Sequence, residues 1–80
     1  MVTVHRAYGF RFAMFVNDHD PPHVRVFGHG GEARIILEGP HGLAVDWFAG
    51  INRGDMRRLI REARQQQERL IAMWRTIHEQ

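Results

Sequence analysis

Residues 23–38 read HVRVFGHGGEARIILE, and this stretch decides the fold. In it, two runs with apolar residues at alternate positions flank the glycine-rich residues 28–31. Period-two alternation interrupted by glycines is typical of an antiparallel hairpin with one buried face. We therefore predict strands over residues 23–27 and 32–38, with Val24 and Val26 facing a core.

The same alternation extends outward in both directions. It predicts strands over residues 2–5 and 10–16 before this hairpin and a shorter strand over residues 43–48 after it. Residues 17–22 must form a loop, because Pro21 and Pro22 cannot donate hydrogen bonds to a sheet. The first half of the chain, about residues 2–48, is thus expected to form an antiparallel sheet of four to five strands.

From Asn52 onward the apolar period becomes helical. Side chains that recur at steps of three and four form one apolar stripe: Met56, Leu59, Ile60, Ala63, Leu70, Ile71, Trp74 and Ile77. Asn52, with Asp55 three residues later, is a typical helix N-cap. Because no helix breaker follows Gly54, we predict one long helix over about residues 53–78. The fold class is then α+β, a two-layer sandwich of a sheet and a helix.

Composition indicates one domain over residues 1–80. The chain has 80 residues, 44% of them hydrophobic, and no cysteine, which excludes a disulfide framework and thiolate chemistry. Neither a signal-peptide layout nor an apolar run of about 20 residues is present, so we expect a cytoplasmic protein that does not enter membranes. A domain this small has a thin core, and a homodimer is one way to stabilise it.

Charge is unevenly distributed along the chain. The net charge is +2, yet residues 53–80 carry seven arginines against four acidic residues. Five of these arginines roughly follow one exposed stripe of the predicted helix: Arg53, Arg57, Arg61, Arg64 and Arg75. Such a stripe could meet nucleic-acid phosphates. However, Glu62 and Glu68 interrupt the sequence, and Arg58 with Glu62 has the spacing of an ordinary ion pair, so a solvated helix face is favoured.

The segment Asp18-His19-Asp20-Pro21-Pro22-His23 is the most unusual local feature. Imidazoles and carboxylates could ligate Zn²⁺ or Mn²⁺. Two histidines four residues apart are a reliable metal spacing on a helix, however, and this segment is a loop. We therefore favour a rigid turn whose side chains bond the backbone, without a metal or cofactor.

A ribonuclease site is the catalytic alternative for the same segment. His19 and His23 could act as general acid and base, with Arg25 or Arg34 stabilising the charge that develops on the phosphate. Residues two apart on a strand share a face, so His23 and Arg25 would project together. The same residues also describe an ordinary solvated sheet face, and we favour a non-catalytic role for them.

That sheet face is the strongest candidate for a binding surface. We expect it to carry Arg11, Phe15, His23, Arg25, Phe27, Arg34 and Ile36. Arginine interleaved with phenylalanine is favoured where proteins bind other proteins and where bases stack. Trp47 and Trp74 fit packing between helix and sheet better than a binding role.

Several segments together resemble a known family. These are Ala7-Tyr8-Gly9-Phe10, the Asp-His-x-Pro-Pro-His motif of residues 18–23, Gly31-Glu32-Ala33 and the late Trp74. They resemble the small prokaryotic proteins catalogued as domain of unknown function 4160. The resemblance implies the α+β fold and a setting beside another small protein, as in toxin–antitoxin-like or regulatory pairs. Arg25 stands where the family pattern has a second histidine on the third strand, and Gln66 where many members have a helical histidine.

These observations favour a non-catalytic module that binds a macromolecular partner in prokaryotic or phage regulation or defence. One version is an inhibitor of the anti-CRISPR type, which blocks a nucleic-acid-guided effector complex. The alternative is a toxin–antitoxin component with ribonuclease activity. A protein is the favoured partner. The alternatives are a second copy of the chain and a nucleic acid.

Overall fold

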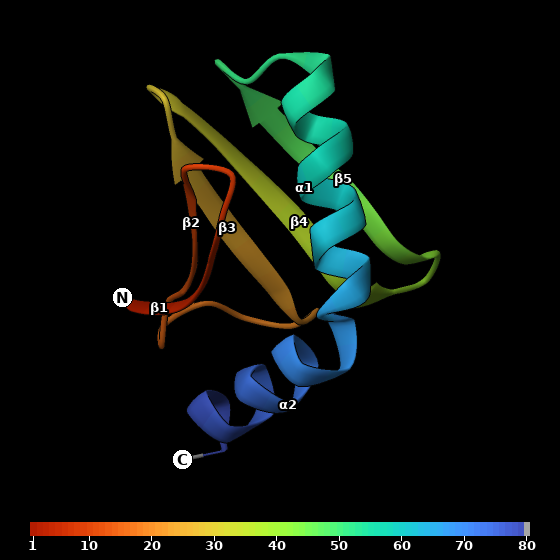
Figure 1. Ribbon diagram of the computed structural model, residues 1–80. Helices are drawn as coiled ribbons and strands as arrows, with labels where there is room; N and C mark the ends of the chain where they lie inside the picture. Colours follow the sequence, from red (N-terminus) through yellow and green to blue (C-terminus); the bar gives the residue numbers. More distant parts are fainter. Residues whose placement is uncertain (80) are drawn as a thin grey trace.

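The computed structural model describes residues 1–79, and its strands follow the alternation of the sequence closely. Five strands form one meander: β1 (Val2–Ala7), β2 (Phe10–Met14), β3 (His23–Gly28), β4 (Gly31–Gly39) and β5 (Gly42–Ala49). Each strand pairs antiparallel with the next, in the order β1-β2-β3-β4-β5. Two helices follow, α1 (Arg53–Gln65) and α2 (Gln67–His78), and they lie on one side of the sheet (Figure 1). The α+β class and the antiparallel sheet are therefore confirmed, with five strands.

Two of the hairpin turns contain two consecutive residues with positive φ. Tyr8 and Gly9 have φ of 56° and 79°, and His29 and Gly30 have φ of 50° and 77°. Two consecutive positive φ angles are the signature of the tight turn whose twist matches that of paired strands. The two turns touch, because the His29 ring lies over Gly9, where a Cβ atom would come within 2.6 Å of it. The glycine of the Tyr-Gly turn is thus favoured by its conformation, and a Cβ atom there would also force the His29 side chain to shift.

A single apolar core lies between the sheet and the helices. Alternate residues of β2, β3 and β4 meet the apolar side of both helices there, and the core cluster includes Phe12, Val26, Ile35, Leu59 and Leu70. Burying large aliphatic and aromatic side chains stabilises a fold by about 1.5–3 kcal/mol each. The predicted N-cap of α1 is also present, because Oδ1 of Asn52 accepts the Asp55 N–H at 2.7 Å.

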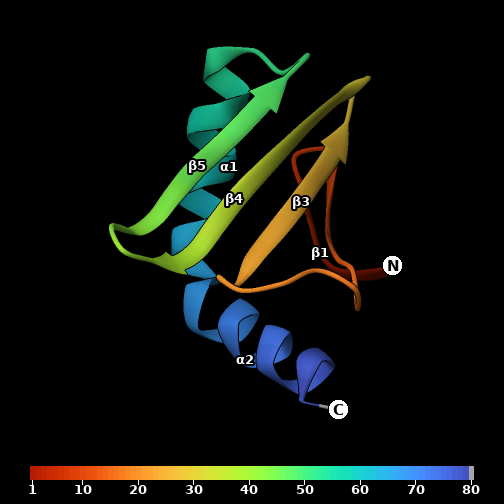
Figure 2. The same ribbon diagram turned by 180° about the vertical axis from the view of Figure 1, so that it is seen from behind.

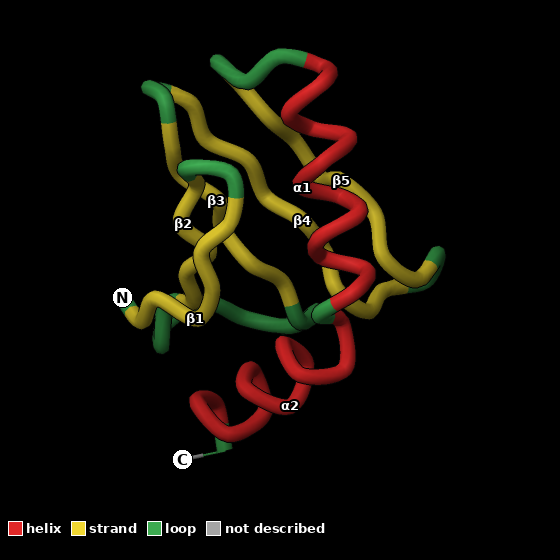
Figure 3. The backbone as a smooth tube through the Cα atoms, viewed as in Figure 1, coloured by secondary structure: helices red, strands yellow, loops and turns green. Residues whose placement is uncertain are grey.

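The prediction of one long helix was wrong. The chain leaves helical geometry at Gln66, whose φ and ψ are −102° and 8°, and α2 runs in a new direction (Figure 3). The stripe position that follows Ala63 by four is Gln67, whose side chain donates to the carbonyl of Leu37 at 2.8 Å. The bend lets α2 turn across the end of the sheet, where Trp74 becomes buried.

A partly buried clamp joins the first strand to both helices. A bulge at Val4 in β1 places the consecutive residues Val4 and His5 on the core side. There Nδ1 of His5 accepts from Arg69 of α2 at 2.8 Å, and Nε2 lies 2.6 Å from a carboxylate oxygen of Glu62 of α1. The expected pair of Arg58 with Glu62 does not form, because Arg58 instead pairs with Asp55 at 2.9 Å.

Neither helix within residues 1–79 is long and apolar enough to cross a membrane.

Candidate functional site

The face of the sheet that the helices leave open carries most of the predicted binding residues. Viewed from behind, β4 and β5 lie in front of α1, α2 lies below the ends of the strands, and no element of residues 1–79 covers β3, β4 or β5 (Figure 2). Cross-strand pairs place Arg25 beside both Ala13 and Arg34, with Trp47 next to Arg34. We define the outer face by its incompletely buried side chains Arg11, Phe15, Arg25, Phe27, Arg34, Ile36 and Trp47.

Arginine and phenylalanine side chains on the outer face are packed against each other. The rings of Phe15 and Phe27 lie nearly parallel, with centroids 6.4 Å apart and an angle of 19° between planes. Cζ of Arg25 lies 4.6 Å from the Phe15 ring centroid, and Cζ of Arg11 lies 5.7 Å from that of Phe27. These are cation–π distances. The side chains therefore hold a defined arrangement before any partner arrives.

Three arginines of the outer face have an unsatisfied group. The Nε atoms of Arg11, Arg25 and Arg34 are buried and have no hydrogen-bond partner within residues 1–79. Nε of Arg34 lies 3.5 Å from an oxygen of Asp46, an ion-pair distance without hydrogen-bond geometry. A buried donor without an acceptor costs about 1–3 kcal/mol.

Trp47 lies on the outer face because β5 contains a bulge that the sequence does not predict. Ile35 pairs with Val45, whereas Arg34 pairs with Trp47, so Asp46 is the extra residue in β5. Without that extra residue Trp47 would pair with Ala33 and point toward the core. The prediction that Trp47 packs between helix and sheet was therefore wrong, and its side chain is 41% exposed. Phe48, its neighbour, is 46% exposed and takes the helix side, opposite Ala33.

His23 does not share this surface, although it lies on the same strand as Arg25. Its side chain is 1% exposed, with Nδ1 2.8 Å from the Pro21 carbonyl oxygen and Nε2 3.0 Å from Oδ2 of Asp18. The other carboxylate oxygen of Asp18 accepts from Nη2 of Arg25 at 3.1 Å. His23 and Arg25 thus hold Asp18 between them, and the motif fixes its own loop to β3.

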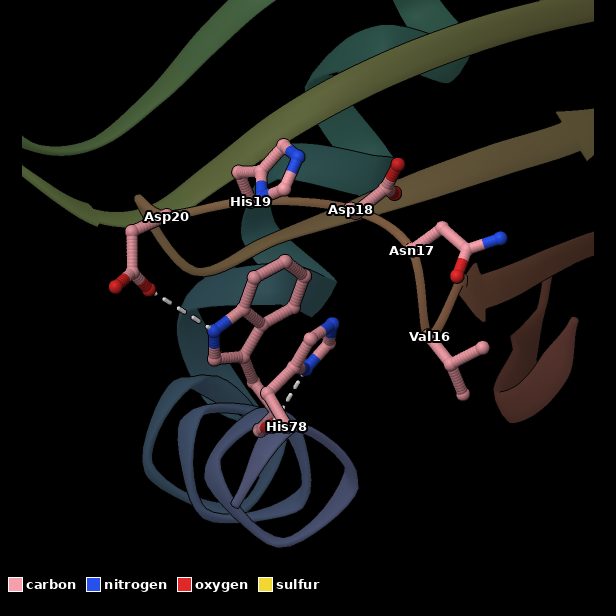
Figure 4. A pocket seen from close by; sticks show the side chains of 7 residues that line it. Val16, Asn17, Asp18, His19, Asp20 and His78 are labelled. Carbon is pink, nitrogen blue, oxygen red and sulfur yellow. Dashed lines mark hydrogen bonds between the residues drawn. The ribbon is translucent and has the colours of Figure 1, made fainter. Parts of the chain in front are cut away.

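The C-terminal helix closes the other side of this loop. The indole N–H of Trp74 donates to Asp20 at 3.3 Å, and the His78 ring stacks on Trp74 at 3.8 Å between centroids. Nε2 of His78 lies 3.0 Å from the carbonyl oxygen of Phe15. These side chains border a cavity of about 560 Å³, lined by Val16, Asn17, Asp18, His19, Asp20, Trp74 and His78 (Figure 4).

The two histidines of the ribonuclease alternative are not brought together at this cavity. His19 is exposed and lines it, whereas His23 is buried behind Asp18 with both ring nitrogens next to oxygen atoms. An acid–base pair must reach the same substrate within hydrogen-bond distance. In this arrangement His19 is the imidazole of the pair that can do so. His23 has a role in positioning the loop.

The histidines and carboxylates of the same loop were also the candidate metal ligands. Within residues 1–79, no three His, Cys, Asp or Glu side chains are grouped so that they could hold a metal ion. The carboxylates of Asp18 and Asp20 are instead engaged by His23, Arg25 and Trp74.

Comparison with known proteins identifies the family of the chain from its sequence. The sequence profile described as domain of unknown function DUF4160 matches residues 9–75. No curated protein and no solved structure matches the chain. The match spans both the motif of residues 18–23 and Gly31, and it confirms the resemblance that those residues carry.

Proposed function

The chain belongs to the family of the domain of unknown function DUF4160, and we propose that it is a non-catalytic module that binds a protein partner through the outer face. The observation that carries the proposal is an open sheet face on which arginines and aromatic rings are already ordered against each other. Arginine, tryptophan and phenylalanine are enriched at protein interfaces, and tryptophan and arginine among the residues that dominate binding energy.

The charges of this face favour a protein over a nucleic acid. Arg25 is already paired with Asp18, and Arg34 lies beside Asp46. Alternating charges of this kind would meet a phosphate backbone with both attraction and repulsion. A partner with a few acidic groups around an apolar centre fits the mixture better.

The same charges argue against a second copy of the chain as the partner. A two-fold contact sets a surface against itself, so arginines near the axis would face arginines. Like charges brought together at an interface cost free energy. We therefore propose a partner of different sequence, and self-association is an outcome that the experiment below can detect.

Regulation or defence in a prokaryote or a phage is the setting we propose for this binding. One version is an anti-CRISPR-type inhibitor that docks on a nucleic-acid-guided effector complex. The support is the family resemblance together with the small size of the domain.

The test compares two aromatic substitutions on adjacent residues. Tagged wild-type protein, Trp47→Ala and Phe48→Ala are used to capture partners from a prokaryotic lysate treated with nuclease, and partners are identified by mass spectrometry. We expect a stoichiometric protein with the wild type and with Phe48→Ala, and a loss of affinity of about 30-fold or more with Trp47→Ala, the scale of an interface hot spot. Adding Arg34→Glu should remove the remaining binding.

Three results would contradict the proposal. A partner that is captured without nuclease treatment but lost after it would indicate that nucleic acid mediates the capture. Equal losses with Trp47→Ala and Phe48→Ala would show that the outer face is not the interface. Self-association in sedimentation that Trp47→Ala abolishes would replace the foreign partner with a second copy.

A further inference from the structure

One flank of α1 carries four arginines without any acidic neighbour. Arg53, Arg57, Arg61 and Arg64 follow one another at steps of four, four and three, which places them on the same side of a helix. We call these four side chains the arginine flank. All four are exposed, and within residues 1–79 none of them makes an ion pair or a side-chain hydrogen bond.

The acidic residues of α1 lie on its opposite flank. Asp55 and Glu62 are seven residues apart, two helical turns, and therefore share a side. Asp55 pairs with Arg58, and Glu62 is turned inward to His5 with its side chain 15% exposed. The expectation that Glu62 interrupts the arginines was thus wrong. Glu68, one turn beyond Arg64 in sequence, lies past the bend at Gln66, and no ion pair joins the two.

The arginine flank also borders a hollow of the surface. Arg57, Arg61 and Arg64, with Gln65, line a depression of about 420 Å³. Its lining contains no carboxylate and no aromatic ring. Chemistry of this kind suits anionic oxygen atoms, and no aromatic ring is present on which a base could stack.

We propose that the arginine flank binds the phosphate backbone of a nucleic-acid duplex. The stretch from residue 53 to 64 is about 16 Å long at 1.5 Å per residue. A DNA duplex carries one charge per about 1.7 Å of axis, so a straight helix of this length meets several phosphates. Binding of this kind reads the backbone and not the bases. The site is separate from the outer face and stands independently of the proposed function.

Other anionic partners fit these observations less well. A helix that lies on a membrane needs apolar side chains beside its basic ones, and the apolar residues Met56, Leu59 and Ala63 are buried against the sheet. An acidic protein surface would need acceptors at four consecutive turns of α1. A duplex offers such a regular row by its covalent structure.

The experiment measures binding of the whole protein to a fluorescent 20-base-pair DNA duplex by anisotropy, as a function of salt. Four phosphate contacts predict a slope of about −3.6 for log K against log salt, and therefore roughly 150-fold weaker binding at 200 mM than at 50 mM salt. Arg57→Gln with Arg61→Gln should lower the affinity on the order of 50-fold at 0.1 M salt and reduce the slope by about 1.8. Glutamine is close to arginine in helix propensity, so the helix should remain intact.

A matched variant with the same loss of charge provides the control. Arg58 and Arg75 are exposed arginines outside the flank, paired with Asp55 and Glu38. Arg58→Gln with Arg75→Gln should leave most of the affinity, with no more than a few-fold change. Circular dichroism of each variant verifies the fold. No duplex binding by the wild type at 50 mM salt, equal losses in both double variants, or equal affinity for polyglutamate or for vesicles of anionic lipid would each overturn the proposal.

Discussion

Asp18 shows at the scale of one residue why the motif of residues 18–23 has its composition. Its two carboxylate oxygens accept from His23 and Arg25, and its side chain is only 14% exposed. A largely buried carboxylate needs such partners, because a buried charge without a partner strongly destabilises the folded state. Arg25 is therefore joined to the same structural network as His23, the histidine that follows the prolines.

This network predicts a large effect of removing Asp18. Asp18→Ala should lower the free energy of unfolding by about 2–3 kcal/mol, because His23 and Arg25 both lose their acceptor. His19→Ala, at the exposed neighbouring position, should change it by less than about 0.5 kcal/mol. Urea unfolding followed by circular dichroism measures both. Equal effects at the two positions would mean that Asp18 does not organise the loop.

Two adjacent glycines allow a second prediction at this scale. A Cβ atom on Gly31 would collide with the carbonyl of Gly50 and come within 2.6 Å of Ile51, whereas a Cβ on Gly30 would meet nothing within 4 Å. Gly31→Ala should therefore cost about 3 kcal/mol, since the contact is with backbone and cannot yield. Gly30 has a φ of 77°, so Gly30→Ala should lower the free energy of unfolding by about 1–2 kcal/mol through backbone conformation alone. Thermal unfolding ranks the two, and the reverse order would refute the packing argument.

At the scale of elements, the sequence predicts the strands directly, whereas the helix bend leaves only an indirect signal in it. Strand positions follow from the alternation around Val24 and Val26, which any half-buried strand must show. The bend at Gln66 depends on where the sheet ends, because Gln67 reaches the carbonyl of Leu37. Local sequence contains no glycine or proline there to signal it. A polar residue in the apolar stripe, Gln67, is the signal that could have indicated it.

The candidate site likewise contains residues whose positions the sequence predicts and residues whose positions depend on tertiary structure. Six of the seven residues predicted for the sheet face do lie on it, because parity along a strand fixes the side to which a residue points. The placement of His23 and Trp47 depended on tertiary features: the loop that folds over His23, and the bulge at Asp46. Neither feature has a local sequence code. Glu62 likewise does not lie on the solvated helix surface, because it contacts His5, a residue 57 positions away in the sequence.

The clamp around His5 carries a prediction about how elements are joined. His5→Ala should lower the free energy of unfolding by about 2 kcal/mol, because Glu62 and Arg69 both lose a partly buried partner. In that background, Glu62→Ala should cost at least about 0.5 kcal/mol less than it does in the wild type. Glu68→Ala, on the exposed surface, serves as the control. Additive effects of the His5 and Glu62 substitutions in urea unfolding would show that the clamp does not couple β1 to α1.

Over the whole molecule, the two-layer build separates two surfaces of different chemistry. The radius of gyration is 11.6 Å, which matches the roughly 12 Å expected of a compact chain of this length. One layer of apolar residues fills the interior, and the sheet and helix layers present their far sides in opposite directions (Figures 1 and 2). The sheet side is aromatic with mixed charge, and the arginine flank is uniformly basic. Such a division would allow one small domain to hold a protein and a duplex together.

That division predicts independent behaviour of the two surfaces. Trp47→Ala with Arg34→Glu should abolish binding of the protein partner and leave the duplex affinity within about threefold, because distant sites without shared contacts act additively to about 0.5 kcal/mol. Arg57→Gln with Arg61→Gln should do the reverse. With all four substitutions in one chain, each loss should equal that of its own double variant, as measured by anisotropy for the duplex and by calorimetry for the partner. If either pair weakened both ligands equally, the two ligands would share one surface, and the separation of functions between the layers of the fold would have to be abandoned.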